Sequence, residues 1–351
     1  MSGEKLRSVP LYRSDLDTAL AHVVGLEGLR GCSVLITGAT GTIGSFVTDL
    51  LLRYNETAAA GITVYAAGRS IERLHKRFGE ADGLVPVSYD VLRPIGFDFS
   101  ADYILHAAGN AHPAAFNGDP VGTVSGSVSG TLALLDYGRR VGAKRLLFVS
   151  SGEVYGQGDL SLDSFREDYA GYLDPLSPRS CYPMGKRAAE NLCAAYTAQY
   201  GLETVVVRPC HTYGPGITPS DSRANAQFVR NVLRGEDIIL KSSGSQLRSY
   251  NYIADCASAL LTVLLRGRTG EAYNLANPAA RVTIAELAGL IAGAAGRRVV
   301  FAVPNAEDLA NRSPIARQVL GTDKLEALGW QGAFIPEEGV RHMLGILRAA
   351  E

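Results

Sequence analysis

A tyrosine and a lysine four residues apart, Tyr182 and Lys186, begin a segment whose composition predicts a helix. Side chains at this spacing share one face of a helix. A phenol is a weak acid with a pKa of about 10, and a neighbouring ammonium group favours its ionised form. The pair could therefore take a proton from a substrate oxygen and return it. Taken alone, the spacing fits an exposed helix without a catalytic role equally well.

A glycine-rich segment, GATGTIG, follows the predicted strand 33–38 directly and precedes a predicted helix. Glycine lets the backbone turn sharply and approach a pyrophosphate, which the N-terminus of the next helix attracts. The position between a strand and a helix favours this reading over a tight turn without a ligand. The predicted dinucleotide-binding loop comprises Gly38, Thr40, Gly41, Thr42, Ile43 and Gly44.

The second predicted strand ends in AAGRS, residues 66–70. A cofactor without a 2′-phosphate usually meets an acidic residue here, but Ala66 and Ala67 occupy the position expected for it. Arg69 could pair with a 2′-phosphate or stack on adenine, which favours NADP, although an ordinary exposed arginine is nearly as consistent. Further expected cofactor contacts follow the third and fourth strands: Asp90, Val91, Ala107, Ala108 and Gly109.

The fifth predicted strand ends in VSSGEVYG, residues 149–156. Ser150 or Ser151 could donate a hydrogen bond to the oxygen that Tyr182 deprotonates. Glu153 adds a carboxylate beside that centre, unless it faces water as a turn residue. A serine, a tyrosine and a lysine could thus meet at one proton-transfer site.

Strands and helices that alternate along the chain position these residues. The apolar strands predict an α/β fold with a doubly wound parallel sheet covered on both faces. From about residue 210 the pattern loosens, which predicts a smaller C-terminal α/β lobe over the carboxyl edge of the sheet, where ligands bind. The expected division is a helical extension at 1–29, a dinucleotide-binding domain at 30–209 joined by parts of 245–278, and a substrate lobe at 210–244 and 279–351.

Composition narrows the class of protein. The 351 residues are 46% hydrophobic and carry 34 basic against 35 acidic residues, which does not indicate a nucleic-acid or membrane surface. Five cysteines without a CxxC pair favour reduced thiols over disulfides or a zinc site, and no metal is expected. Without a signal peptide or a membrane-spanning run, we expect a soluble cytoplasmic protein.

The glycine loop, the strand-end serine and Tyr-x-x-x-Lys together resemble the short-chain dehydrogenase/reductase superfamily. RPCHTYGP (208–215), GSQLRSYNYIAD (244–255), LGW (328–330) and EEG (337–339) are similar to its extended branch, which modifies sugar nucleotides. The resemblance covers about residues 30–345. It implies a Rossmann-type core, NAD+ as cofactor, a nucleotide-sugar substrate and a homodimer formed through helices that include the tyrosine helix.

Within that branch, PRSCYPMGKRAAENLCAAY and SSGEVYG are most similar to the UDP-glucuronate decarboxylase pattern. The resemblance implies that Tyr182 is the base for oxidation at C4 and that Ser151 polarises the C4 oxygen. Lys186 would hold the nicotinamide ribose and lower the tyrosine pKa, and Glu153 would act near C5. The 4-keto uronate would then lose CO2 and yield a UDP-pentose. Arg248 matches the arginine near the diphosphate, and the remaining implied contacts are Pro209 for the cofactor and Asn110, His112, His211 and Arg223 for the substrate.

Several positions depart from the branch and leave the product open. Gly152 replaces the aspartate of 4,6-dehydratases, His211 replaces an asparagine, and Ser127 replaces the asparagine of N-V-x-G-T. For His112 a structural loop role is favoured over substrate contact. A UDP-hexuronate or UDP-hexose 4-epimerase and an NADPH-dependent 4-keto-sugar reductase are alternatives. A dinucleotide-sensing scaffold without catalysis is the alternative from another class.

Overall fold

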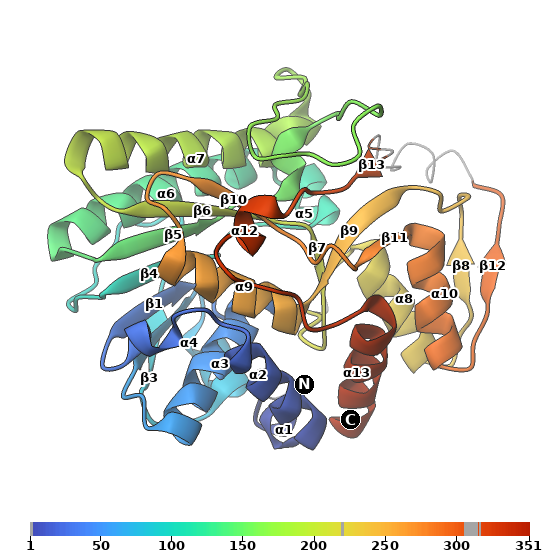
Figure 1. Ribbon diagram of the computed structural model, residues 1–351, viewed down its shortest axis with the longest axis horizontal. Helices are drawn as coiled ribbons and strands as arrows, with labels where there is room; N and C mark the ends of the chain where they lie inside the picture. The colour runs from blue at the N-terminus through green and yellow to red at the C-terminus, as the bar shows by residue number, and fades with distance from the viewer. Residues whose placement is uncertain (1–2, 219–220, 305–314, 316) are drawn as a thin grey trace.

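The protein is built around a seven-stranded parallel sheet, as the computed structural model shows for residues 3–218, 221–304, 315 and 317–351 (Figure 1). The strand order is β10-β6-β5-β4-β1-β2-β3. The chain therefore winds in one direction from β1 and in the other from β4, which confirms the doubly wound α/β fold and places a crevice at the switch point. The strands are β1 (Ser33–Thr37), β2 (Thr63–Gly68), β3 (Leu84–Ser88), β4 (Tyr103–His106), β5 (Arg145–Val149), β6 (Thr204–Pro209) and β10 (Ala272–Leu275).

Helices cover both faces of this sheet because its strands are apolar on both sides. In β1, Val34 and Ile36 join one hydrophobic cluster while Leu35 joins the other. The first cluster includes α3 (Thr42–Ala58) and α9 (Ile253–Arg266). The second includes α6 (Pro120–Val141) and α7 (Cys181–Tyr200), which lie side by side in Figure 1. The α4 helix (Ile71–Phe78) follows β2 directly.

The N-terminal segment that we expect to be helical, residues 1–29, contains α1 (Gly3–Ser8), α2 (Pro10–Ala21) and a 3-10 turn at Leu26–Leu29. Proline is favourable at the first position of α2 because its missing N–H would be unpaired there anyway. On its inner side, Asp15 accepts a hydrogen bond from Tyr252 at 2.5 Å and lies 2.7 Å from His342. These contacts tie α2 to β9 and to the C-terminal helix α13 (Pro336–Ala349).

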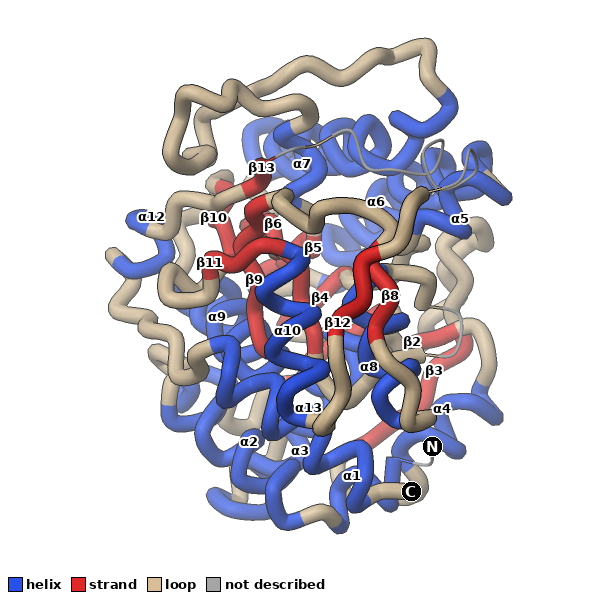
Figure 2. The backbone as a smooth tube through the Cα atoms, turned by 90° about the vertical axis from the view of Figure 1, so that its right-hand side faces the viewer, coloured by secondary structure: helices blue, strands red, loops and turns tan. Residues whose placement is uncertain are grey.

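The later part of the chain forms two small sheets and several helices beside the main sheet (Figures 1 and 2). In one small sheet β9 pairs with β7, β11 and β13, and in the other β8 pairs with β12. After α9 the chain returns to the main sheet, because β10 pairs with β6. The remaining elements are α5 (Pro113–Gly118), η2 (Gly152–Tyr155), η3 (Pro178–Ser180), β7 (His211–Tyr213), α8 (Ala224–Leu233), β8 (Ile238–Leu240), β9 (Leu247–Tyr252), β11 (Arg281–Thr283), α10 (Ile284–Ala294), β12 (Val299–Phe301), β13 (Arg317–Gln318) and α12 (Asp323–Glu326).

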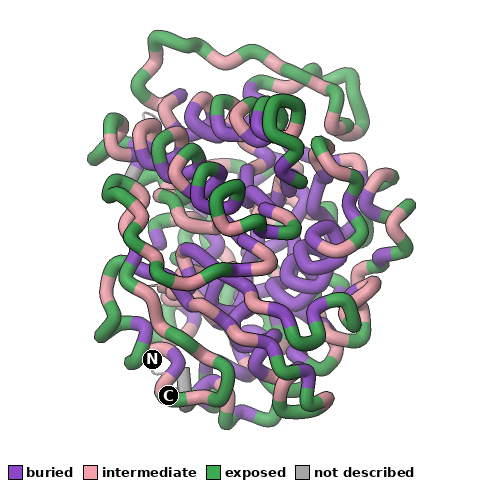
Figure 3. Tube along the Cα trace, turned by 90° about the vertical axis from the view of Figure 1, so that its left-hand side faces the viewer, coloured by how far each residue is buried: buried purple, intermediate pink, exposed green. Residues whose placement is uncertain are grey.

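Buried residues concentrate between the sheet and its helices, while the outer helix faces and loops are exposed (Figure 3). All five cysteines are free thiols. Among the described residues, no helix has the length and apolar character needed to cross a bilayer.

Candidate active site

A cleft of about 860 Å³ lies at the carboxyl ends of the sheet strands and collects the predicted residues. All of the predicted site residues except Arg248 line it, although they come from separate strands, loops and helices. The predicted residues in the lining are Gly38, Thr40, Gly41, Thr42, Ile43, Gly44, Arg69, Asp90, Val91, Ala107, Ala108, Gly109, Asn110, His112, Ser151, Glu153, Tyr182, Lys186, Pro209, His211 and Arg223.

The glycine-rich loop leaves no room for side chains where it passes β4 and enters α3. Gly38 has φ +70°, and a Cβ there would lie 2.8 Å from the carbonyl oxygen of Ala107. A Cβ on Gly44 would lie 2.3 Å from the carbonyl oxygen of Gly38. No side chain caps the N-terminus of α3 at Gly41, so the first-turn N–H groups remain available to an anion. The loop therefore fits the pyrophosphate of a dinucleotide.

The end of β2 differs in detail from the sequence expectation. Ala66 and Ala67 are fully buried in the sheet, and Gly68 and Arg69 face the cleft instead. Gly68 is therefore the position where an acidic side chain would reach the ribose, and no carboxylate stands there. A Cβ on Gly68 would make only ordinary contacts with Leu74, at 3.7 Å or more, so the site has space for a side chain.

Three further cations that we did not predict line the same end of the cleft: Arg73, Lys76 and Arg77 of α4. Arg69, Arg73 and Lys76 are exposed, and Arg77 is partly buried against Asp49. The repeated arginines and lysine of RSIERLHKR were the available signal, because residues at positions i and i+4 of a helix share a face. The end of the cleft beside β2 and α4 is therefore lined by four cationic side chains.

Tyr182 lies in the first turn of α7, with its ring stacked on Phe116 of α5 at a centroid distance of 4.5 Å. Ser151 lies near enough to its hydroxyl to influence the pKa of the phenol. Burial and the nearby Glu153 carboxylate raise the pKa of Tyr182 to about 12, while Ser151, Arg223 and Arg179 act to lower it. In the free protein, Tyr182 is therefore a neutral phenol at pH 7.

Lys186 lies one helical turn further and donates a hydrogen bond to the carbonyl oxygen of Val149 at 2.7 Å. Burial lowers its pKa from 10.5 to about 8, against the opposing effects of Glu190 and Cys193. The expectation that Lys186 lowers the pKa of Tyr182 is not met in the free protein. Burial has the largest effect on the pKa of Tyr182 and raises it, because removing an anion from water is unfavourable, and the groups that act to lower it are Ser151, Arg223 and Arg179.

The structure distinguishes the two serines at the end of β5. Ser150 donates to Glu190 at 2.5 Å, whereas Ser151 accepts from the N–H of Glu153 at 3.1 Å and acts to lower the pKa of Tyr182. Arg208 of β6 binds both oxygens of Glu190, at 3.0 and 2.7 Å. This buried network joins β5, β6 and α7 behind the cleft.

Glu153 pairs with Arg179, which sequence reasoning missed although it lies three residues before Tyr182. The nearest nitrogen–oxygen distance is 3.2 Å. Arg179 also stacks on Phe116, 4.8 Å from the ring centroid, on an aromatic pair that continues to Tyr182. The ion pair thus fixes the position of the Glu153 carboxylate close to Tyr182.

His211, Arg223 and Arg248 form the other side of the site. Burial and the two arginines lower the pKa of His211 to about 3, and its Nδ1 has no hydrogen-bond partner in the described part of the chain. Arg223 pairs with Asp221 at 2.6 Å and donates to the carbonyl oxygen of Thr212. Arg248 is buried behind the lining and donates to the carbonyls of Leu247 and Ile315. His211 is therefore a neutral imidazole in a positive environment.

Two other predicted residues are placed at the mouth of the cleft. His112 is half-buried, with Nδ1 3.5 Å from Oγ of Ser222, and Asn110 precedes it on the same loop. Gln318 of β13 reaches the lining and donates to the carbonyl oxygen of Gly152 at 2.8 Å. No sequence signal indicated Gln318.

Within the described ranges, no group of three or more His, Cys, Asp or Glu side chains is arranged to hold a metal ion.

Comparison with known proteins gives a family match and named relatives. The model of the NAD dependent epimerase/dehydratase family matches residues 34–276. A UDP-glucuronic acid decarboxylase of Danio rerio is 34% identical over 311 residues, which cover 88% of this chain and 70% of the relative. One from Arabidopsis thaliana is 33% identical over 89% of this chain and 90% of its own length. Among solved structures, a dTDP-glucose 4,6-dehydratase from Streptomyces venezuelae with NAD bound has a TM-score of 0.75 at 25% identity, over 90% of this chain and 97% of the other.

Proposed function

We propose, because the chain belongs to the NAD dependent epimerase/dehydratase family, that it oxidises C4 of a nucleotide-linked sugar and later returns the hydride. More specifically, we propose UDP-glucuronate as the substrate and a UDP-pentose and CO2 as the products. The curated relatives named above are UDP-glucuronic acid decarboxylases at 33% and 34% identity. The observation that carries the proposal is the meeting of Ser151, Glu153, Tyr182 and Lys186 in one cleft with the glycine-rich loop.

Tyr182 acts as the proton acceptor for the C4 hydroxyl. Its side chain is buried, and Ser151 lines the same cleft close enough to influence its pKa, so the serine is placed to hold the same sugar oxygen. When bound, the dinucleotide supplies a positively charged nicotinamide ring that accepts the C4 hydride and donates it back. Positive charge near the phenol favours its ionised form, which opposes the effect of burial. Lys186 adds a second buried positive group on the same helix face.

Glu153 acts at the next stage. Oxidation at C4 places a ketone β to the C6 carboxylate of a uronic acid, so CO2 can leave as the C5–C6 electron pair moves into an enolate. A proton must then be added at C5 before the hydride returns to C4. Glu153 lies beside Tyr182 and is held by Arg179 at 3.2 Å. We therefore assign to Glu153 the positioning of the proton donor at C5.

The cofactor preference that the basic end of the cleft supports is NADP. A carboxylate would repel a 2′-phosphate, and none stands at Gly68. Arg69, Arg73 and Lys76 line the same end and are exposed, so they are free to approach a phosphate from solvent. Binding constants of NADP+ and NAD+, measured by calorimetry on cofactor-free protein, test this; tighter binding of NAD+ would contradict it.

The same observation favours a second candidate function, the NADPH-dependent reduction of a 4-keto sugar nucleotide. NADPH that binds and leaves in each turnover suits net reduction, whereas a decarboxylase keeps its cofactor bound and returns the hydride to the sugar.

The decisive experiment is incubation of the purified protein with UDP-glucuronate and a catalytic amount of cofactor. Release of CO2 with a UDP-pentose supports decarboxylation, whereas conversion without mass change indicates a 4-epimerase. Unchanged UDP-glucuronate, together with stoichiometric NADPH loss on a 4-keto sugar, would replace the first proposal by the second.

Residue roles and assembly remain proposals alongside this function. We propose a homodimer formed through α6 and α7, where Leu132 and Tyr200 are exposed, and light scattering of the purified protein measures it. The division into an extension, a dinucleotide domain and a substrate lobe is proposed at the boundaries given above. The cytoplasmic location stays a prediction.

A further inference from the structure

Two helices precede the residues that the family model matches, and they pack against the wall of the cofactor cleft. The α1 and α2 helices lie beside α3 and α4 in Figure 1. The match itself begins at residue 34. On the inner face of α2, Tyr12 is only 1% exposed. The side chain of this residue therefore reaches the protein interior next to the dinucleotide-binding loop and helix.

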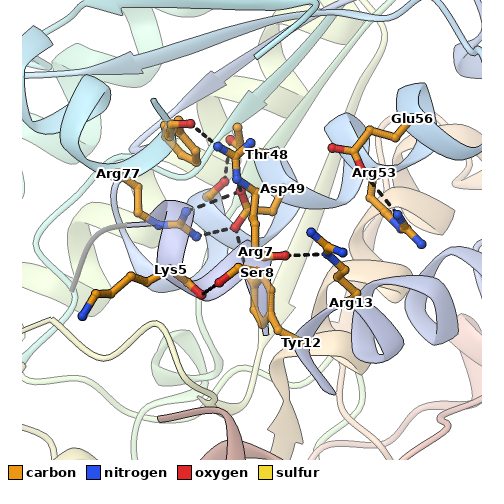
Figure 4. Close-up of polar contacts among 12 residues, drawn as sticks. Lys5, Arg7, Ser8, Tyr12, Arg13, Thr48, Asp49, Arg53, Glu56 and Arg77 are labelled. Carbon is orange, nitrogen blue, oxygen red and sulfur yellow. Dashed lines mark hydrogen bonds and ion pairs between the residues drawn. The ribbon is translucent and has the colours of Figure 1, made fainter. Parts of the chain in front are cut away.

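Tyr12 meets a buried ion pair there, shown in Figure 4. Its hydroxyl donates to Oδ2 of Asp49 at 2.7 Å. Arg77 binds the same carboxylate through Nη2 at 2.5 Å and Nη1 at 3.4 Å. The side chain of Asp49 is fully buried, so every hydrogen bond to it matters for keeping its charge in the interior.

Arg7 adds a second contact from the extension. Its guanidinium lies 3.9 Å from Asp49, and Nη2 donates to the carbonyl oxygen of Phe78 at the end of α4. The last carbonyls of a helix have no partner within the helix, so this donor stabilises the end of α4. The extension therefore holds α4 at its last turn through both Asp49 and the helix end.

Arg77 connects these contacts of Tyr12, Arg7 and Asp49 to the cleft, because it also lines the end of the cleft beside β2 and α4, where we expect the adenosine. Arg73 is four residues earlier and shares its helix face, and Arg73 lines the cleft as well. The partner carboxylate, Asp49, belongs to α3, whose N-terminus follows the glycine-rich loop. The Asp49–Arg77 pair thus fixes the distance between the two walls that a cofactor phosphate must bridge.

We propose that the N-terminal extension is a positioning element for cofactor selection: Tyr12 orients Asp49, and Asp49 orients Arg77 and the cationic face of α4 toward a 2′-phosphate. This inference rests on the proposed preference for NADP. Tyr12, Asp49 and Arg7 are positioning residues, since none of them lines the dinucleotide cleft. Loss of the Tyr12 hydroxyl frees the carboxylate to rotate, and Arg77 with it.

The test compares Tyr12→Phe with Tyr252→Phe. Both tyrosines are 1% exposed and donate to a fully buried aspartate, but the aspartate of Tyr252 is Asp15, which has no arginine in the cleft. Calorimetry on cofactor-free proteins gives the binding constants of NADPH and NADH for the wild type and both variants. We expect Tyr12→Phe to weaken NADPH binding about five- to tenfold, which is less than the full effect of losing one hydrogen bond to a charged group because Tyr12 acts only through Asp49 and Arg77, and to leave NADH unchanged. We expect Tyr252→Phe to lower the melting temperature without changing the NADPH-to-NADH ratio.

The outcomes separate the two proposals. A wild type that binds NADH as tightly as NADPH overturns the proposed cofactor and this inference with it. A wild type that prefers NADPH, with an unchanged ratio in Tyr12→Phe, overturns the inference alone. Arg7→Ala serves if Tyr12→Phe does not fold, because the Arg7 side chain is 19% exposed, and the same shift in the ratio is expected.

Discussion

Replacing Lys186 by methionine should make the cofactor-free protein more resistant to unfolding, and the gain should depend on pH. Burial lowers the pKa of Lys186 from 10.5 to about 8. Between these values the unfolded chain binds a proton at this residue and the folded chain does not, so the stability of the wild type rises with pH. Below pH 8 Lys186 is protonated in both the folded and the unfolded protein, and burial of its ammonium group then lowers the free energy of unfolding by the full amount. A difference of about 2.5 pH units corresponds to about 3 kcal/mol.

Urea unfolding at several pH values between 7 and 10 measures this contribution. The difference in unfolding free energy between Lys186→Met and the wild type should fall by about 2 to 3 kcal/mol across that range. The lost hydrogen bond to Val149 lowers the stability of the variant at every pH and therefore cancels in the slope. Comparing slopes rather than absolute stabilities also removes other groups that titrate equally in both proteins.

Lys144→Met is the matched control. Lys144 lies largely in solvent, 3.1 Å from Asp102, and its hydrogen bond to that carboxylate raises its pKa. Its contribution is present below its ordinary pKa of 10.5 and is lost only as pH rises through the raised value, so the difference between Lys144→Met and the wild type should stay nearly constant from pH 7 to 10. A Lys186→Met difference that stays constant from pH 7 to pH 10 would refute a buried amine with a depressed pKa.

Three further predictions concern the reaction and the cofactor. Tyr182→Phe should reduce turnover at least about 100-fold and leave dinucleotide binding intact, measured by product formation and calorimetry; near-normal turnover would remove Tyr182 as the acid–base group. Glu153→Gln should allow oxidation and CO2 loss in a first turnover but slow the protonation of C5 that precedes hydride return, so that absorbance of the reduced nicotinamide at 340 nm accumulates; a variant that turns over at the wild-type rate without this accumulation would contradict its role. Gly68→Asp should shift the NADPH-to-NADH affinity ratio at least about tenfold toward NADH, because a carboxylate repels the 2′-phosphate and binds ribose hydroxyls; an unchanged ratio would show that the phosphate does not lie there.

The sequence predicted the sheet and most of the cleft because local pattern controls both. A glycine trio between a strand and a helix can be recognised without knowing the fold, and the carboxyl ends of parallel strands meet at one edge. Residues placed at strand ends, such as Ser151 and Val91, therefore came together as expected. The alternation of Val34, Leu35 and Ile36 between two helix layers follows from the same strand geometry.

Other features depend on contacts between distant segments, which a single sequence does not show. Gln318 reaches the cleft only because β13 pairs with β9. Arg248 matched a motif, yet its guanidinium is turned to backbone carbonyls behind the lining. The sequence predicts a lowered pKa for Tyr182, whereas the structure raises it. The spacing of Tyr182 and Lys186 indicates that the two are neighbours, but it does not indicate the burial that has the largest effect on the pKa. Arg179 differs from these residues because it is close to Tyr182 in the sequence. Even so, nothing in its position indicated that it pairs with Glu153.

The edge strand β10 has a consequence for how the chain matures on the ribosome. Its neighbour β6 ends at residue 209, but residues 272–275 must be synthesised before that edge is covered. Until then β6 exposes a row of unpaired backbone groups that can capture a strand from another chain. Asn274 of β10 also completes the polar contact to Tyr155 at 2.5 Å. A nascent chain halted between these points should therefore need chaperone protection, even with every glycine of the nucleotide loop already made.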